Sequence, residues 1–517
     1  MAQTFRPPAT QRVYDVCVIG SQLGGVVAGA LLARRGFRVL HVAHDDPGFH
    51  YVDHGYVLPF GPAVLPSPRQ LPSADAVLAE LGLTTDVSRT LAPSDPDLQL
   101  LLPRHRVDLS REPAILRTEL RREWPREADA LEAAFAGLGT LFDFAGFFLR
   151  AMPPLPPDGF VERHVVRKAL KVAASARGAP GRRADQARPF EGFEDHELVR
   201  SLLAAHRFLT YLDGPPSPLS LVRLLGGAFR GTNRLPGGLG TLREMVRRRI
   251  AESRGELRGG PGEPALASAL ELDGSRVAAV RLADSPSAHV ARAFVVATDA
   301  DRLLALLPPE LRDARATSEL RRVRATRQLL SVNLVVKETA LPPALGDNVL
   351  ALRDATAGDG LDNAVFLQVL PARRDTKKGS DKGVQTSSDA VTDERVVCAS
   401  GFVPAGEGRA ALEGAATRIR EAVADAIPFF ERHLVAESAP VLAANDRADL
   451  SAAHPLYAAD REDSLGVAAL PVRGPWKNLI FAGREVIPGL GIEGEFYAGI
   501  QAAGHVAALL GRKDVLK

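Results

Sequence analysis

The first forty residues alternate apolar runs with small-residue stretches in a strand, turn and helix order. Residues 14–19 form an apolar run that predicts a buried strand, and a glycine-rich stretch with helical character follows it. A second apolar run at residues 38–43 predicts the next strand. Together they predict the opening βαβ unit of a Rossmann fold.

Short apolar runs with polar connections dominate the second half of the chain. The runs at residues 277–282 and 293–298 predict a hairpin that returns to the first sheet. Four further strands are predicted, at residues 329–337, 349–353, 364–370 and 395–403. These strands predict a second, antiparallel sheet, and the polar stretch 373–392 predicts a disordered loop.

Helical periodicity marks residues 112–149 and 408–434. The end of the first region, residues 133–149, carries five phenylalanines and one charge. A basic stretch follows at residues 161–188, with eight Lys or Arg against two acids. Two interpretations of these neighbouring segments stay open. The first is a core helix beside a solvated helix and loop. The second is contact with an anionic membrane surface, or a hydrophobic substrate channel.

Composition narrows the class of protein. A chain of 517 residues exceeds one ordinary core, and 46% apolar with 24% charged residues is typical of a soluble globular protein. The net charge of +2 favours no polyanionic partner, and the basic residues lack interleaved aromatics, so we expect no nucleic-acid binding. The first dozen residues lack the apolar segment of a secretory signal, so we expect a cytoplasmic protein.

Cysteines and histidines suggest no metal chemistry. We expect Cys17 and Cys398 to be buried free thiols, because each lies in an apolar, strand-like run. His41 is expected to point outward from the second strand. None of the histidines has metal-ligand spacing with another ligand, so no metal is predicted.

The first glycine turn departs from the G-x-G-x-x-G pattern of dinucleotide-binding proteins. Gly20 and Gly25 fill the outer glycine positions, but Gln22 fills the middle one, where the pyrophosphate approaches the backbone. Ala43 stands where an acidic residue normally holds the ribose, and Asp45 lies just beyond it. The pattern therefore indicates the fold more strongly than the ligand.

Two further glycine turns lead into helices. Residues 231–240 precede a helix predicted from about residue 241. Residues 477–483 predict a strand that ends in a turn, and after residues 489–494 a helix is predicted over 495–510. A helix N-terminus presents free N–H groups and a positive dipole end, which suits a phosphate or an electron-rich ring edge.

The three turns, taken in order, resemble those of the phytoene desaturase family of flavoproteins, which includes carotenoid desaturases and retinol saturases and is related to the amine oxidases. The resemblance covers nearly the whole chain. It implies an α/β fold: a split Rossmann-like FAD-binding domain of the glutathione reductase and amine oxidase type, with an inserted α+β substrate domain that contains an antiparallel sheet and helices. We expect FAD-binding segments at residues 1–70, 231–310 and 471–517, and substrate regions at 71–230 and 311–470.

The resemblance also implies site residues. FAD-binding positions on the three turns are Gly20, Gln22, Gly25, Gly29, Asp45, Gly237, Gly238, Gly240, Gly483, Glu485, Gly489, Gly491 and Ile492. FAD would carry the hydride step, because no side chain accepts hydride. Glu493 and Glu495 are the candidate catalytic carboxylates, and their alternative role is a favourable interaction with a helix N-terminus.

Two functions stay open. The first is an FAD-dependent oxidoreductase, of desaturase, saturase or isomerase type, acting on a hydrophobic polyisoprenoid, carotenoid or lipid. The second is a family member that has lost the cofactor and acts as a binding or scaffolding subunit, as a homo-oligomer or with a partner subunit. Gln22 and Ala43 favour the second function, and the intact C-terminal turn favours the first. For either function, any contact with a membrane is expected to be peripheral and on its inner face.

Overall fold

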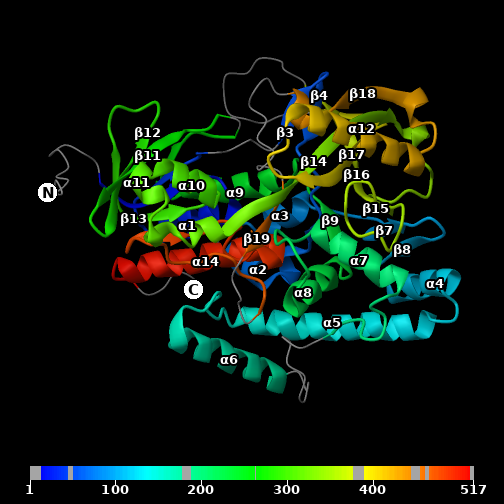
Figure 1. Cartoon of the computed structure of the whole chain (residues 1–517), viewed down its shortest axis with the longest axis horizontal. Coiled ribbons are helices and arrows are strands. Elements are labelled where there is room, and N and C mark those ends of the chain that lie inside the picture. Colours follow the sequence, from blue (N-terminus) through cyan, green and yellow to red (C-terminus); the bar gives the residue numbers. More distant parts are fainter. Residues whose placement is uncertain are drawn as a thin grey trace.

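The computed structural model describes residues 13–44, 50–176, 188–261, 263–375, 389–443, 454–459 and 465–512. Figure 1 shows two sheets beside each other, one built around β11–β13 and a larger one around β14–β18. Helices α5 and α6 run along one edge of the molecule (Figure 1). The first and third glycine turns follow strands of the first of these sheets, and the middle turn follows the strand Thr232–Arg234 of a small third sheet.

Seven strands from three distant segments form the first sheet. β1 (Val13–Ile19) lies between β2 (Val39–Val42) and β13 (His289–Val296), parallel to both. β10 (Glu256–Arg258) extends the sheet beyond β2, and β20 (Leu479–Phe481) pairs with β13. The hairpin of β11 (Ala267–Asp273) and β12 (Arg276–Leu282) completes it. The predicted Rossmann-like α/β fold is confirmed.

Three helices pack together beside this sheet. α1 (Leu23–Arg34) contacts both α9 (Gly238–Glu252) and α14 (Gly491–Leu509). α9 and α14 begin inside their glycine turns, a few residues earlier than predicted. Each turn therefore supplies the first residues of a helix.

The second sheet has ten strands and is mainly antiparallel. Its main order is β18-β14-β17-β16-β15-β7-β8, with β19 on β14 and the β3–β4 hairpin on β16. The strand bounds are β3 (His50–Asp53), β4 (Tyr56–Pro59), β7 (Leu98–Leu101), β8 (Arg106–Leu109), β14 (Val323–Lys337), β15 (Asn348–Leu352), β16 (Ala364–Arg374), β17 (Asp389–Pro404), β18 (Leu434–Ser438) and β19 (Pro455–Ala459). Helix α12 (Arg409–Ala426) packs on β14 and β17. A small third sheet joins β5 (Leu65–Pro66), β9 (Thr232–Arg234) and β6 (Ala92–Pro93).

The remaining helices lie mostly between and below the sheets. They are α2 (Pro72–Glu80), α3 (Thr84–Thr90), α4 (Pro113–Glu123), α5 (Ala128–Arg150), α6 (Gly159–Ala176), α7 (Glu197–Arg207), α8 (Pro218–Ala228), α10 (Ala300–Leu306), α11 (Pro309–Arg312) and α13 (Pro440–Ala443). Among the described helices, α5 alone is long and apolar enough to cross a membrane. Its phenylalanines Phe142, Phe144 and Phe148 are buried, and it packs on α4 and α8, so its apolar character serves the protein core.

Three local expectations were wrong. Both ends of the loop predicted over residues 373–392 are strand instead, because β16 continues through Pro371 to Arg374 by a register shift and β17 begins at Asp389. Residues 376–388 of that prediction lie outside the described residues. The helix predicted to residue 434 ends at Ala426. His41 points inward and is fully buried, because β2 lies between β1 and β10 in a covered parallel sheet.

Candidate functional site: three glycine turns and a cavity

Close packing explains the glycines of the first turn. Gly20 has φ +105°, and a Cβ added there would lie 2.1 Å from the carbonyl oxygen of Ala297. A Cβ on Gly25 would lie 2.1 Å from the Ala297 Cβ, and one on Gly29 would lie 3.1 Å from Ile250 Cδ1. The glycines thus let α1 approach the end of β13 and the side of α9.

The Gln22 side chain fills the space beside the first turn. Its Nε2 donates to Asp299 Oδ1 at 2.8 Å, and its Oε1 accepts from the backbone N–H of Arg484 at 2.9 Å. A Cβ on Gly483 would lie 2.4 Å from this Oε1. The glutamine therefore ties the first turn to the third across the place where the resemblance puts a pyrophosphate.

Glu495 brings a carboxylate to the N-terminus of α1. Its Oε2 accepts from the backbone N–H of Leu23 at 2.9 Å, and its Oε1 accepts from the Tyr211 hydroxyl at 3.0 Å. Burial raises the pKa of Glu495, while the Arg484 guanidinium and these hydrogen bonds favour the charged form. A helix N-terminus binds anions well, and here the anion comes from the chain itself.

The same buried network includes Asp299 and Glu485. Asp299 Oδ1 also accepts from the Tyr457 hydroxyl at 2.6 Å, and the Arg484 Nε lies 3.8 Å from it. Glu485 Oε2 accepts from the backbone N–H of Ala300 at 2.8 Å, so it caps α10. Burial and the neighbouring Asp299 raise the pKa of Glu485. The predicted cofactor residue Glu485 thus has a structural partner.

The third turn is covered by protein. Gly491 has φ +53°, and a Cβ there would lie 2.1 Å from the carbonyl oxygen of Leu209. A Cβ on Gly489 would lie 2.7 Å from Val467 Cα. The backbone N–H of Tyr211 donates to the Pro488 carbonyl at 2.9 Å. Packing therefore accounts for both glycines, and neither they nor Ile492 line the two cavities described below.

Glu493, on the first turn of α14, forms a buried ion pair. Arg223 of α8 donates to it through Nε at 2.9 Å and Nη2 at 3.0 Å, and both side chains are fully buried. Burial raises the pKa of Glu493, and the Arg223 guanidinium opposes that shift. Glu493 lines neither cavity, so its surroundings match the structural alternative named for it.

The middle turn borders open space. Gly237 and Gly238 line a cavity of about 310 Å³ whose walls are mainly apolar. The apolar walls come from Leu58, Pro59, Leu235, Met245, Leu370 and Val396. A second cavity of about 120 Å³ shares these two glycines and extends to Gly240, Gln22 and Glu495. The predicted residues of the first and middle turns thus come together around neighbouring cavities.

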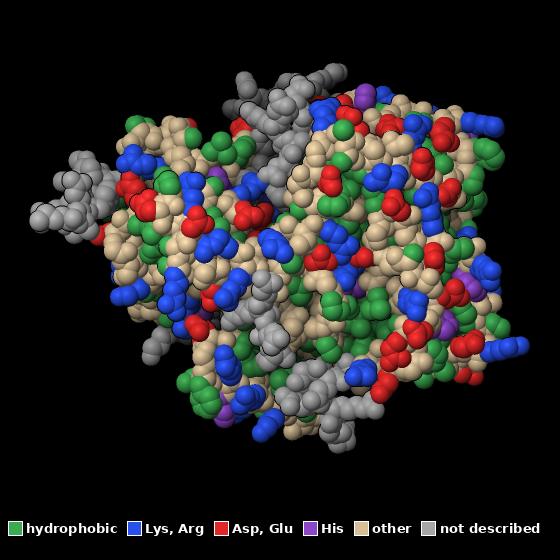
Figure 2. Space-filling model, viewed as in Figure 1, with side chains coloured by type: hydrophobic (Ala, Val, Ile, Leu, Met, Phe, Trp, Pro, Cys, Tyr) green, Lys and Arg blue, Asp and Glu red, His purple; other side chains and the backbone are tan. Residues whose placement is uncertain are grey.

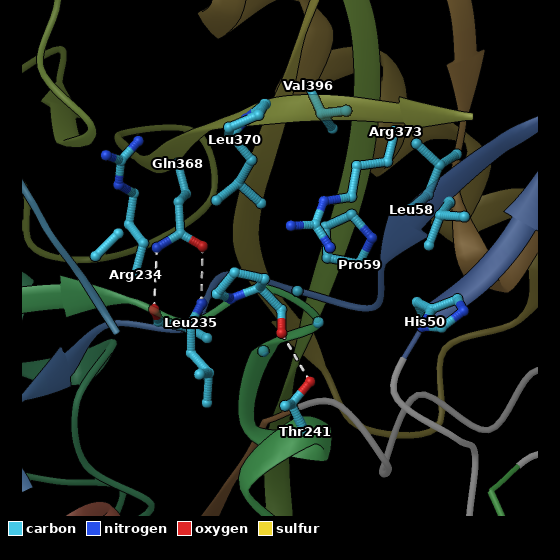
Figure 3. A pocket seen from close by; sticks show the side chains of 18 of the residues that line it. His50, Leu58, Pro59, Arg234, Leu235, Thr241, Gln368, Leu370, Arg373 and Val396 are labelled. Atoms are coloured by element: carbon cyan, nitrogen blue, oxygen red, sulfur yellow. Dashed lines mark hydrogen bonds between the residues drawn. The ribbon is translucent and has the colours of Figure 1, made fainter. Parts of the chain in front are cut away.

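Polar groups in the larger cavity are mostly engaged. Gln368 holds the backbone of Ala63 through two hydrogen bonds of 3.0 and 3.1 Å, drawn in Figure 3. Arg234 pairs with Asp347 at 2.9 Å, and Arg248 pairs with Glu244 at 3.4 Å.

Arg373 is the exception. It comes from the end of β16, and Figure 3 shows its side chain reaching inward near Pro59 and Leu58. No described acidic residue forms an ion pair with it.

A dinucleotide in the predicted pose would meet a first turn already occupied by side chains. Its pyrophosphate would compete with Gln22 and the Glu495 carboxylate for the space at α1, whereas the guanidinium groups of Arg243 and Arg484 line the same cavity and favour an anion. A ring edge at the third turn would meet the Leu209–Tyr211 backbone. Asp45, the candidate ribose ligand, lies outside the described residues.

Comparisons with known proteins agree with the fold. A family model of the NAD(P)-binding Rossmann-like domain matches residues 18–81. A cyclohexylamine oxidase from Brevibacterium oxydans superposes with a TM-score of 0.56 at 16% identity, over 97% of this chain and 100% of that one. A putrescine oxidase gives 0.55 at 14% identity, over 96% and 100%. The chain has the fold of the amine oxidases.

A further match is an oxidoreductase from Methanosarcina mazei, with a TM-score of 0.56 at 14% identity over 94% of this chain and 99% of that one. No curated protein matches the chain by sequence. The oxidase fold supports the FAD prediction, whereas the narrower likeness to phytoene desaturases stays a prediction. At this identity the fold is shared, and the side chains at the turns decide what each chain binds.

Two residues of the site were not predicted from the sequence. Arg373 fell in the stretch predicted as a disordered loop, because that stretch is polar and the strand predicted at residues 364–370 continues to Arg374. Arg223 is the only charge in the apolar helix α8, and a lone charge on an apolar helix is a usable signal for a buried ion pair. Within the described ranges, no group of three His, Cys, Asp or Glu residues is arranged to hold a metal.

Proposed function

We propose that the chain binds a hydrophobic carboxylic acid in the cavity at the Pro236–Gly240 turn, without a dinucleotide at the first turn. The observation that carries this proposal is Arg373, a guanidinium that faces a mainly apolar cavity and has no described acidic partner. A buried or half-buried cation without a counter-ion favours a ligand that supplies one.

The rest of the cavity suits the other end of such a ligand. Leucines, a methionine and prolines line it, and the volume of about 310 Å³ is at the lower end of small-molecule sites. Arg234 and Arg248 already pair with carboxylates, so Arg373 remains for the acid group. The Gln368 clamp on Ala63 keeps the wall beside the turn in place, because Ala63 lies next to Gly238.

The closed first turn supports a flavin-free protein. Gln22 and Glu495 already satisfy the partners that an FAD pyrophosphate would take in the predicted pose. It supports the second function named from the sequence, a binding or scaffolding protein.

A second candidate is an FAD-dependent oxidoreductase acting on a hydrophobic polyisoprenoid, carotenoid or lipid. The match to oxidases over more than nine-tenths of the chain favours it. It requires Gln22 and Glu495 to leave the positions described above before FAD can bind. We derive no catalytic step from it.

The purified protein distinguishes the two candidates. We expect a colourless protein whose melting temperature is unchanged by FAD and raised by decanoic acid, with decanol and decylamine at least about tenfold weaker because they lack the charge that Arg373 pairs with. Copurified flavin, or a melting temperature raised by FAD, would establish the oxidoreductase instead. Binding of decylamine in preference to the acid would contradict the assigned ligand class.

A double substitution tests the closure directly. Gln22→Gly with Glu495→Ala removes both groups from the first turn, and we expect the variant to gain measurable affinity for ADP by calorimetry. The matched control is Gln501→Ala, which truncates a polar side chain of α14 but leaves the first turn and the Arg223–Glu493 pair unchanged. If circular dichroism shows that the double variant is folded and calorimetry still detects no ADP binding, the two side chains are not what closes the site.

A further inference from the structure

Helix α6 exposes an apolar stripe at the edge of the molecule. Phe160 is 79% exposed, Val161 74%, Val165 43% and Val172 51%. At about 100° per residue, the three valines fall within about 40° of one another around the helix. They lie on one side of the helix, with Lys168 between Val165 and Val172, and the buried residues Val166 and Ala173 lie on the side that faces the protein.

The position of α6 leaves this stripe without a described neighbour. Figure 1 shows α6 as the outermost helix beyond α5, and α5 is the helix against which it packs. In Figure 2 hydrophobic and basic side chains lie next to each other in this region of the surface. An exposed stripe of large apolar side chains costs free energy in water, so it indicates a surface that is covered in use.

Basic side chains flank the stripe. Arg163, Arg167, Lys168 and Lys171 are exposed, and none of them forms an ion pair with a described acidic residue. The acid on the helix, Glu162, is paired with Arg473 at 3.2 Å. The free charge on the outer side of α6 is therefore positive.

We propose that α6 docks on an anionic membrane surface. Its apolar stripe would enter the boundary between headgroups and acyl chains, and its lysines and arginines would lie among the anionic headgroups. A second copy of the chain fits less well, because a symmetric pair of α6 helices would bring like charges together. The proposal is independent of what the cavity binds.

Vesicle flotation with the full chain tests the docking. We expect flotation with vesicles of phosphatidylcholine and phosphatidylserine, little with phosphatidylcholine alone, and release at high salt. Lys168→Glu with Lys171→Glu should weaken binding to the anionic vesicles at least about tenfold, since each basic residue near the surface contributes about fivefold. Phe160→Ser with Val161→Ser should weaken it as well, by loss of the apolar contact.

The control is Phe429→Ser, which removes a phenylalanine of similar exposure, 67%, at the distant segment η6 (Phe430–His433). It should float like the wild type. The proposal is overturned if the wild type does not float with anionic vesicles, or if the α6 variants float as well as Phe429→Ser does. A wild-type dimer in size-exclusion chromatography with light scattering that Phe160→Ser dissociates would assign the stripe to a second copy instead.

Discussion

The first and middle glycine turns begin helices in the same way and differ in what faces those helices. At the first turn, α1 meets the Glu495 carboxylate and the Gln22 side chain. At the middle turn, Gly237 and Gly238 border the cavity. The difference shows that glycines in such a turn indicate only that another part of the chain or a ligand comes close to the backbone. A carboxylate of the protein can occupy the place at the helix N-terminus where an anionic ligand would be expected.

The third turn is closed more completely than the first, because Gln22, Leu23 and Glu495 of the first turn still line the smaller cavity and no glycine of Gly489–Gly491 lines either cavity. Each closed turn has a buried carboxylate and a buried histidine beneath it. His41 lies 3.1 Å from the Gly20 carbonyl oxygen, and His206 contacts Ser220, whose hydroxyl donates to the Gly489 carbonyl. The closed turns are thus parts of the folded core, and substitutions there should act on stability, whereas substitutions at the middle turn should act on binding.

The largest effect is expected at the third turn, from Arg223→Met. The substitution leaves Glu493 charged and buried without a partner, so the free energy of unfolding should fall by about 3–5 kcal/mol. The matched control is Arg230→Met, just beyond the same helix, where the exposed pair with Asp143 contributes no more than about 1 kcal/mol. If urea denaturation shows equal losses of unfolding free energy in the two variants, the buried pair contributes no more to stability than the exposed pair.

A pair of alanine substitutions compares the closed and open turns directly. Gly491→Ala meets the Leu209 carbonyl and a positive φ, so it should cost roughly 3 kcal/mol or more. Gly238→Ala also meets a positive φ, +64°, but only an ordinary contact with Ala63, and should cost about 1 kcal/mol. If thermal unfolding shows the reverse order, the third turn has room that the structure does not show.

The buried histidines should make stability depend on pH. Burial lowers the pKa of His206 from its ordinary value of 6.5 to about 3, and that of His41 likewise to about 3. Below pH 6.5 the unfolded chain takes up a proton that the folded chain does not, so stability falls as the pH falls. Each histidine should remove about 2 kcal/mol between pH 7 and pH 5.

Buried carboxyls act in the opposite sense, because a raised pKa lets the folded chain take up the proton first. The variant His206→Gln isolates the histidine term: its loss of stability between pH 7 and pH 5 should be about 2 kcal/mol smaller than that of the wild type. An identical pH dependence in His206→Gln would contradict the buried, neutral state.

The smallest effect in free energy is expected in the cavity. Arg373→Gln should weaken decanoic acid binding about tenfold, or about 1.4 kcal/mol, with the melting temperature of the free protein nearly unchanged. Arg248→Gln is the control, because that arginine lines the same cavity but pairs with Glu244. Calorimetric affinities that fall equally in both variants would show a general effect of charge and would remove the specific role of Arg373.

Much of the fold could be predicted from local patterns. Apolar runs located β1, β2, β12 and β13, and the glycine stretches located the starts of α1, α9 and α14 to within a few residues. Such features depend on neighbours close in sequence, so their signals survive in a single chain. The path of β16 past Pro371 could not be predicted, because a register shift depends on the partner strand β17.

The candidate site could be predicted only in part. Gln22 stood out against the glycine pattern, and the structure places it where that pattern suggested an obstruction. That Glu495 reaches Leu23, and that Arg223 meets Glu493, depends on contacts between residues hundreds of positions apart. Glycines alone could not distinguish packing from binding, and the closed third turn therefore resembled an intact ligand site.

The strand order of the first sheet has a consequence for how the chain folds during its synthesis. β1 finds its partner β13 some 270 residues later, and β20 joins only near the end of the chain. During synthesis β1 can pair with β2 early, but its other edge stays open until β13 has emerged. Pairings of such long range fold slowly and leave edges open to aggregation, so this chain should depend on chaperones more than its stable core suggests.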